Sequence, residues 1–267
     1  MKVETSRFYD NELDKICNVV WQVDGIPFYQ KEIILPSGFV EVIFNLSAEV
    51  KYQYGKYEKF NLVPKFFING INTIPISLTP QGHHAFFGIQ LYPFALKSLF
   101  NIPAYKITNE AIELNEIFPN AQELWYKLIE VDNFSKRKQI VFFELKNLLE
   151  KNKKKCEMFC FINALHFLLS NKSTISEMAK LLNISSRQLH RKALEFLGTN
   201  PEYFIKYHRF VNSVKLINQN KNSLTEIAYL CKYFDQSHFI RDFKHFSNLT
   251  PLSYLKERKG ANGHIYF

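Results

Sequence analysis

The feature that most constrains this chain is an internal repeat in its C-terminal half. Residues 174–182 (TISEMAKLL) return 49 positions later as residues 223–231 (SLTEIAYLC). Each copy begins with a hydroxyl residue that is followed three positions later by glutamate, a capping-box pattern that satisfies free N–H groups at a helix start. Each copy also has a small alanine at the middle of its short helix, where a second helix can cross closely. The repeat therefore predicts two similar short helices, each closely packed against a partner.

A tight polar turn follows each copy and leads into a second helix. These second helices begin with residues 186–191 (SRQLHR) and 236–241 (QSHFIR), and their apolar residues Leu189 and Phe239 are 50 positions apart. Because the first helices are offset by 49 positions, the second turn must contain one additional residue. A capped helix, a turn and a second helix form a helix-turn-helix arrangement. The residues expected to pack inside the two motifs are Ile175, Met178, Ala179, Leu182 and Leu189, then Leu224, Ile227, Ala228, Leu230, Phe239 and Phe243.

The outward side chains of both second helices are of the types that read DNA bases. Arginine can bond to O6 and N7 of guanine together, and glutamine can bond to N6 and N7 of adenine. A single arginine or histidine on a helix is usually only solvated, but the same chemistry on two motifs favours DNA contact. The candidates are Ser186, Arg187, Gln188, His190 and Arg191 in the first motif, and Gln236, Ser237, His238 and Arg241 in the second.

The charge of the chain is unevenly distributed between its two halves. Residues 1–150 hold 15 Lys and Arg against 17 Asp and Glu, whereas residues 151–267 hold 19 against 8. The halves thus carry −2 and +11, which favours two domains, the second facing a polyanion, with nucleic acid a better candidate than a membrane. No apolar run approaches the roughly 18 to 20 residues of a membrane span, and the first residues do not resemble a secretory signal. We expect a cytoplasmic protein whose four cysteines are reduced.

The first hundred residues favour a β-rich fold. Aromatic and β-branched segments alternate with Pro and Gly turn signals, a pattern typical of antiparallel sheet. We predict strands near 33–35, 39–46, 66–69 and 85–91, then a short helix over 93–100 and longer helices near 120–131 and 135–151. The lysine-rich run 151–155 is the predicted linker, and either a solvated helix end or a phosphate contact would explain it.

A longer helix is predicted between the two motifs. Asn200 suits its N-cap and Pro201 its first turn, and the helix would extend to about Gln219. Its apolar residues, expected to contact both motifs, are Phe204, Tyr207, Val211, Val214 and Ile217. A rigid spacer has a purpose here, because two helices enter successive major grooves on one DNA face only when they lie roughly 34 Å apart.

The segment from about 158 to 258 resembles the AraC/XylS family of bacterial transcription regulators. The most specific part is DQSHFIRDFK at 235–244, followed by Leu249-Thr250-Pro251 and Tyr254. The resemblance implies a DNA-binding domain with two helix-turn-helix motifs. Base contacts implied by motif position fall on Arg187, His190, Arg191, Gln236, Ser237, Ile240 and Arg241, and Lys244 joins them as a DNA-binding candidate.

Three positions depart from the family pattern. Lys232-Tyr233 replaces the usual Gly-Phe of the second turn, so a residue with a side chain must take the turn geometry there. Asn248 replaces a later glycine and suits a left-handed backbone. Leu255 replaces an arginine, which removes one phosphate contact.

The N-terminal half resembles, more loosely, a domain that is often fused ahead of such modules. Its marks are Leu35-Pro-Ser-Gly38 with Glu41 to Leu46, and Gly88 to Pro93. In the wider family this position holds a β-barrel, often cupin-like, that binds an effector or dimerises. Either role is open for this chain.

Enzyme chemistry has little support in the sequence. His83 and His84 are adjacent, so in a strand they point to opposite faces and do not match the His-x-His pattern of metal-binding cupins. Cys156 and Cys160 lack further partners at zinc spacing. A DNA-alkylation-repair enzyme that carries the same DNA-binding module is the main alternative, but it would need a cysteine cluster in an N-terminal half that holds only Cys17.

These observations predict an α+β protein of two domains. Residues 1–150 would form a β-rich sensor or dimerisation domain, and residues 157–260 an all-α domain of two helix-turn-helix motifs joined by a linker helix. We expect a sequence-specific transcription regulator without catalytic residues, cofactor or metal. Double-stranded promoter DNA is the expected partner. A small-molecule effector, RNA polymerase and a second copy of the chain are further candidates.

Overall fold

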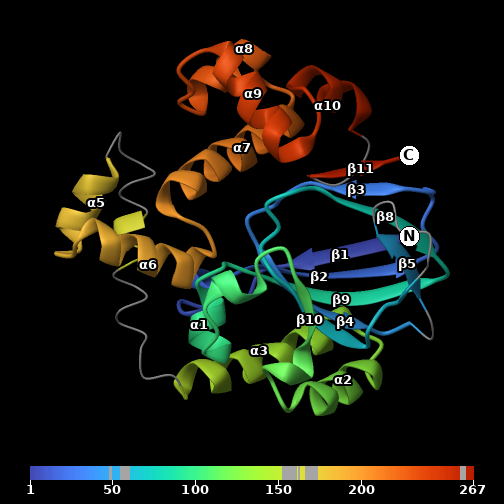
Figure 1. The fold of residues 1–267 in the computed structure, drawn as a ribbon. Coiled ribbons are helices and arrows are strands. Elements are labelled where there is room, and N and C mark those ends of the chain that lie inside the picture. The colour runs from blue at the N-terminus through green and yellow to red at the C-terminus, as the bar shows by residue number, and fades with distance from the viewer. Residues whose placement is uncertain (48–49, 55–60, 152–160, 162, 166–173, 259–262) are drawn as a thin grey trace.

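The computed structural model describes residues 1–47, 50–54, 61–151, 161, 163–165, 174–258 and 263–267. It has a β-rich N-terminal half and a helical C-terminal half, as the sequence predicts (Figure 1). The predicted lysine-rich linker after Lys151, the pair Cys156 and Cys160, and the predicted change to helix near 157 lie outside these residues. No helix in the described segments is long and apolar enough to cross a membrane.

Two antiparallel sheets make up the N-terminal half. The six-stranded sheet has the order β1 (Lys2–Ser6), β2 (Cys17–Gly25), β9 (His84–Leu91), β4 (Val40–Asn45), β7 (Phe66–Asn69) and β10 (Ala111–Glu113). The five-stranded sheet has the order β11 (His264–Tyr266), β3 (Glu32–Ile34), β8 (Ile76–Gln81), β5 (Lys51–Tyr54) and β6 (Asn61–Leu62). All four predicted strands are present, at β3, β4, β7 and β9.

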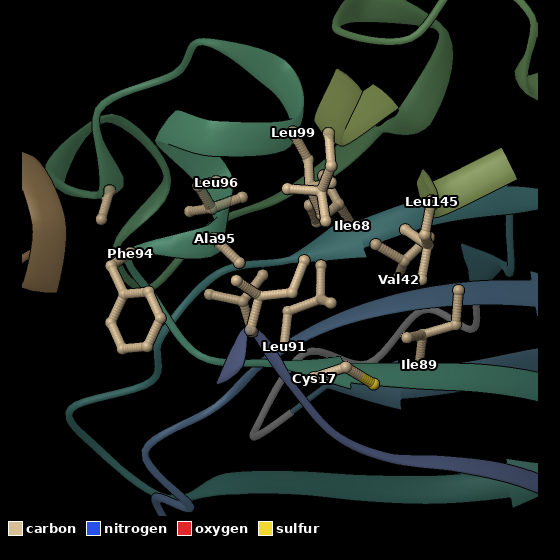
Figure 2. Packing of buried hydrophobic residues seen from close by; sticks show 14 of the residues in the cluster. Cys17, Val42, Ile68, Ile89, Leu91, Phe94, Ala95, Leu96, Leu99 and Leu145 are labelled. Atoms are coloured by element: carbon tan, nitrogen blue, oxygen red, sulfur yellow. The ribbon is translucent and has the colours of Figure 1, made fainter. Parts of the chain in front are cut away.

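Helices cover one face of the six-stranded sheet. These are α1 (Ala95–Phe100), α2 (Ala121–Ile129) and α3 (Phe134–Glu150), with the 3-10 turns η1 (Leu13–Lys15), η2 (Ala104–Ile107) and η3 (Leu114–Glu116). Side chains alternate along each strand, so Val42 of β4 and Ile89 and Leu91 of β9 point toward these helices, where they meet Leu96 of α1 and Leu145 of α3 (Figure 2). This face of the sheet is the centre of the main hydrophobic core.

Within residues 174–258 the C-terminal half contains six helices. They are α5 (Ile175–Leu181), α6 (Ser186–Leu197), α7 (Pro201–Gln219), α8 (Leu224–Leu230), α9 (Gln236–Ser247) and α10 (Pro251–Glu257). The pairs α5–α6 and α8–α9 are the two predicted helix-turn-helix motifs, and α7 is the predicted linker helix.

One predicted core residue of the second motif is in fact exposed. Leu230 keeps 51% of its surface accessible, and the buried residue at the end of α8 is Cys231. The repeat itself relates Cys231 to Leu182, whereas Leu230 corresponds to Leu181, which is also exposed. The prediction was wrong because it favoured the larger apolar side chain over the register of the repeat.

The two motifs belong to different hydrophobic cores. The buried residues of α5 and α6, among them Met178, Leu189 and Phe196, are continuous with the core of the N-terminal half. The linker helix and the second motif form a separate cluster that includes Phe210, Phe243 and two residues of the N-terminal half. These two residues are Leu35 and Ile71.

The end of the chain returns to the N-terminal half. Strand β11 pairs antiparallel with β3, placing Ile265 opposite Ile33, and it lies beside β3 at the edge of the smaller sheet (Figure 1). Ile265 is fully buried in the second cluster, and Tyr266 stacks on Tyr29 with ring centroids 4.2 Å apart. The second motif is therefore held to the N-terminal half on both sides, through α7 and through β11.

Candidate nucleic-acid interface

Both predicted capping boxes are present at the starts of α5 and α8. The Thr174 hydroxyl accepts a bond from the Glu177 amide while the Glu177 carboxylate accepts one from the Thr174 amide at 2.6 Å. Ser223 and Glu226 repeat this arrangement, with 2.7 Å between the Ser223 amide and the Glu226 carboxylate. The backbone bonds lower the pKa of both glutamates below the usual range, because an anion accepts these bonds more strongly. The first helix of each motif thus begins in the same way.

The turns of both motifs pass through a left-handed residue. Asn183 has a φ of 53° in the first turn, and Lys232 has a φ of 61° in the second. Lys232 therefore adopts the left-handed backbone conformation that glycine usually provides in this turn, which confirms the prediction from the sequence. Asn248 likewise adopts a φ of 60° at the C-cap of α9, which fits the tolerance of asparagine for this conformation.

The second helix of the first motif, α6, presents two exposed arginines. Arg187 and Arg191 are exposed on successive turns, while Leu189 between them is fully buried. Neither guanidinium bonds to any residue that the structure describes. Ser186 is exposed at the first position of the same helix. The N-terminal part of α6 can therefore present charge to a groove without breaking an internal contact.

Two other candidates on α6 have partners within the protein. The Gln188 side-chain oxygen accepts a bond from the Ser185 amide at 2.8 Å, which completes a third capping box. His190 Nε2 lies 3.2 Å from Glu202 Oε1. The first contact disfavours the use of Gln188 in a bidentate bond to adenine, because it turns the side-chain amide toward the backbone of Ser185. The pattern Ser-x-x-Gln at 185–188 was visible in the sequence and predicts this role.

The second helix of the second motif, α9, presents a more mixed surface. Gln236, Ser237, Ile240 and Arg241 are exposed along its first two turns, and Lys244 is exposed further on. Gln236, Ser237, Arg241 and Lys244 make no side-chain hydrogen bond or ion pair with any described residue. His238 is different, because it lies 3.2 Å from Asp242 and its ring packs edge-on against Tyr233.

The linker helix joins the two motifs as the sequence predicts. The Asn200 side chain caps its N-terminus and Pro201 occupies the first turn. Phe204 packs against the core of the first motif, whereas Val214 and Ile217 belong to that of the second. Tyr207 in its middle also contacts the N-terminal half, since its hydroxyl accepts a bond from the Gly38 amide at 2.7 Å and donates to the Asn72 carbonyl at 2.9 Å.

One exposed residue near α9 was not among the candidates. Phe234 stands immediately before Asp235, the N-cap of the helix, and keeps 92% of its surface accessible. Helical periodicity does not predict its exposure, because it lies in the turn. The only sequence signal is that the first helices of the motifs are 49 positions apart and the second helices 50, which indicates an additional residue in this turn.

Two family models match separate parts of the chain. A helix-turn-helix domain matches residues 178–257, which contain α6 to α10 and most of α5. A domain of unknown function, DUF6597, matches residues 10–113 in the β-rich half.

Curated relatives match part of the chain. The uncharacterized HTH-type transcriptional regulator YidL of Escherichia coli (strain K12) is 30% identical over 95 residues, which are 36% of this chain and 32% of the relative. The HTH-type transcriptional activator RhaS of Escherichia coli O139:H28 is 25% identical over 130 residues, which are 46% and 47% of the two chains. The match thus spans less than half the length of either relative.

Among solved structures, ToxT from Vibrio cholerae covers 97% of this chain and 100% of its own, with 17% identity and a TM-score of 0.49. The helix-turn-helix family model falls on the helical region of the two motifs, and the curated relatives are named as HTH-type transcriptional regulators. The C-terminal part of this chain is therefore a helix-turn-helix domain of the AraC/XylS type.

Proposed function

We propose that the protein is a sequence-specific DNA-binding transcription regulator. The observation that carries this proposal is the presence of two capped helix-turn-helix motifs whose second helices both expose arginine, at Arg187, Arg191 and Arg241, with no partner among the described residues. The curated relatives, named as transcriptional regulators, support the same function. Residues 157–260 would act as the DNA-binding domain and residues 1–150 as its regulatory partner.

The exposed residues divide into two proposed roles. Arg187 and Arg191 in the first motif, with Gln236, Ser237 and Arg241 in the second, would contact base edges, where arginine selects guanine and glutamine selects adenine. Lys244 and Ser186 would contact phosphates and fix the register of the helices on DNA. His190 and His238 can contact DNA only after they break their contacts with Glu202 and Asp242, so we propose that they contribute less to base recognition.

Selection of DNA sites in vitro, at two salt concentrations, tests this function. We expect an enriched motif with two half-elements about one helical turn apart, and an affinity that falls as salt rises because phosphate contacts release counterions. Binding without any motif that disappears with salt would contradict a specific regulator.

A single substitution then assigns one of the contacts. Arg187→Ala should weaken binding to the selected site by roughly 1–3 kcal/mol and relax the base preference at one position. Lys136→Ala is the charge-matched control, because Lys136 is exposed on α3 in the other half of the protein. Unchanged affinity and preference in Arg187→Ala would remove this residue from the reading set.

We further propose that the N-terminal half senses an effector between its two sheets. The inner face of the six-stranded sheet leaves more of its side chains accessible than the face under the helices, since Trp21, Ile43 and Phe67 are only half-buried there. Glu41 lies on the same face, accepts a bond from the Gln90 amide at 2.8 Å, and has a pKa raised by burial. Aromatic rings beside convergent polar groups favour a sensor over a domain that only dimerises.

A thermal-shift screen of small polar metabolites would test this role. A ligand that raises the melting temperature of the wild-type protein should lose its effect in Glu41→Leu, while DNA binding without ligand is kept in both. Sedimentation of the free protein and of the DNA complex measures dimerisation, and transcription with purified RNA polymerase distinguishes activation from repression.

The repair-enzyme alternative is not favoured by the cysteines that the structure describes. Cys17 and Cys231 are both buried, and burial raises the pKa of Cys17 to about 12 and that of Cys231 to about 11. A methyl acceptor needs a thiolate, which such thiols do not form near neutral pH. The described residues also contain no group of three or more His, Cys, Asp or Glu side chains placed to hold a metal ion.

A further inference from the structure

The additional residue in the second turn can be identified from the backbone bonds of the two motifs. In the first turn the Ile184 amide donates to the Ala179 carbonyl at 3.0 Å, and in the second the Tyr233 amide donates to the Ala228 carbonyl at the same distance. Ile184 and Tyr233 are therefore equivalent. Ser185 follows Ile184 directly as the N-cap of α6, whereas the N-cap of α9 comes one residue later. The residue without a counterpart is Phe234.

The environment of Phe234 separates it from its neighbours. Tyr233 is buried against Phe239, with ring centroids 5.1 Å apart, so the chain is fixed immediately before the additional residue. Asp235 fixes it immediately afterwards, because its side chain accepts a bond from the His238 amide at 2.6 Å. Phe234, held between these two positions, is the most exposed large hydrophobic residue among those that the structure describes.

We propose that Phe234 is a specificity-determining residue that contacts the 5-methyl group of a thymine in the half-site bound by the second motif. This inference rests on the proposed function. The N-terminal residues of the second helix of such a motif contact base edges in the major groove, and Phe234 lies next to that end of α9. Thymine is the only standard base that presents a methyl group there, and phenylalanine is a side chain that contacts it.

The surrounding residues support a base contact in this place. Gln236, Ser237 and Arg241 offer hydrogen bonds, but none of them can recognise a methyl group by hydrogen bonding. Ile240 is the other exposed apolar residue on the first two turns of α9. The first motif has no equivalent of Phe234, because Ile184 is followed directly by Ser185, the N-cap of α6. The two motifs should therefore differ in base preference, and only the second should prefer a thymine through an apolar contact.

Replacing thymine by uracil tests this directly, because the change removes only the methyl group. Sites selected with the full-length protein would be synthesised with one deoxyuridine at a time in each half-element. For the wild-type protein we expect one such position in the half-element of the second motif to weaken binding about fourfold, the factor that corresponds to about 0.8 kcal/mol for one buried methyl group. Phe234→Ala should bind the thymine site more weakly and should no longer distinguish thymine from uracil at that position.

Two control variants accompany this measurement. Phe143→Ala removes another exposed phenylalanine ring, on α3 and outside both motifs, and should keep the uracil effect. Phe234→Leu keeps an apolar side chain and should retain part of the preference. Because Phe234 is exposed, its removal should leave the melting temperature unchanged.

The outcomes separate this inference from the proposed function. If the wild-type protein selects no site, both are wrong. If a site is selected and Arg187→Ala weakens it, but no uracil substitution matters or Phe234→Ala keeps the full uracil effect, the inference alone is overturned. A uniform loss at all sites in Phe234→Ala would indicate contact with the DNA backbone. A variant that binds normally but loses transcription would indicate a protein partner; either result also overturns it.

Discussion

The two helix-turn-helix motifs share one local structure but differ in how the rest of the protein holds them. The first packs into the main core, with Lys97 of α1 paired to Glu195 of α6 at 3.2 Å and the Thr108 hydroxyl donating to the Gly198 carbonyl. The second has its own core and reaches the N-terminal half through Tyr207 and strand β11. The comparison teaches that the repeated sequence determines the local structure of each motif. Contacts outside the repeat determine which part of the N-terminal half each motif is connected to.

The largest expected effect compares two phenylalanines that are 50 positions apart. Phe196 and Phe246 are both almost fully buried on the second helices of their motifs. Replacing either by alanine should cost about 3–5 kcal/mol of the free energy of unfolding, because each leaves a large cavity. In Phe196→Ala, hydrogen exchange should accelerate in α1 and η2 as well as α6, since they share one core. In Phe246→Ala it should accelerate in α7 to α10. Identical exchange maps for the two variants would contradict the separation of the cores.

The second prediction concerns the pH dependence of the contact that β11 makes. His264 Nδ1 bonds to Glu32 of β3 in a site that Glu41 also faces. Burial disfavours the charged imidazole, but the bond and the charges of Glu32 and Glu41 outweigh burial and raise the pKa of His264 above its usual 6.5. The folded protein therefore holds this proton more tightly than the unfolded chain does. The resulting stability is fully present below pH 6.5 and is lost as pH rises through the folded pKa.

Melting curves of the wild-type protein and His264→Gln from pH 5.5 to 9 measure this effect. The difference between their melting temperatures should be largest at the acidic end and should shrink toward pH 9. Burial raises the pKa of Glu41 and the charge of His264 lowers it, so the comparison measures His264 together with its effect on Glu41. A difference that stays constant over the whole range would show that proton binding at His264 does not stabilise β11 on β3.

Local features of the motifs could be predicted from the sequence because neighbouring residues determine them. The two capping boxes, the caps of α7 and the left-handed backbone at Lys232 and Asn248 all depend on residues within a few positions. Repetition made these patterns reliable, because two copies had to satisfy the same physical requirement. Gln188 was predicted to contact bases, but the sequence Ser-x-x-Gln at 185–188 also predicts the capping box that it forms with Ser185.

Long-range pairing could not be predicted in the same way. Strand β11 has three residues, and its partner β3 lies more than 200 positions earlier, so no periodicity in the sequence connects them. Strand β2 was missed although it has nine residues, because its burial follows from packing on both neighbouring strands rather than from strict alternation. The continuity of the first motif with the main core was also invisible, since it depends on which helix faces meet in three dimensions.

The smallest expected effect compares the two capping residues. Thr174→Ala and Ser223→Ala each remove a hydroxyl that accepts a backbone bond at 3.2 Å, and each should cost about 1 kcal/mol of stability. Because α5 packs into the main core and α8 into the smaller one, we expect Ser223→Ala to lower DNA affinity through the second motif alone. Scanning base-pair substitutions across the selected site would show this as a loss of preference in one half-element, with the other unchanged. Thr174→Ala should produce the reverse pattern, and equal losses in both half-elements for either variant would mean that the motifs unfold as one unit despite their separate cores.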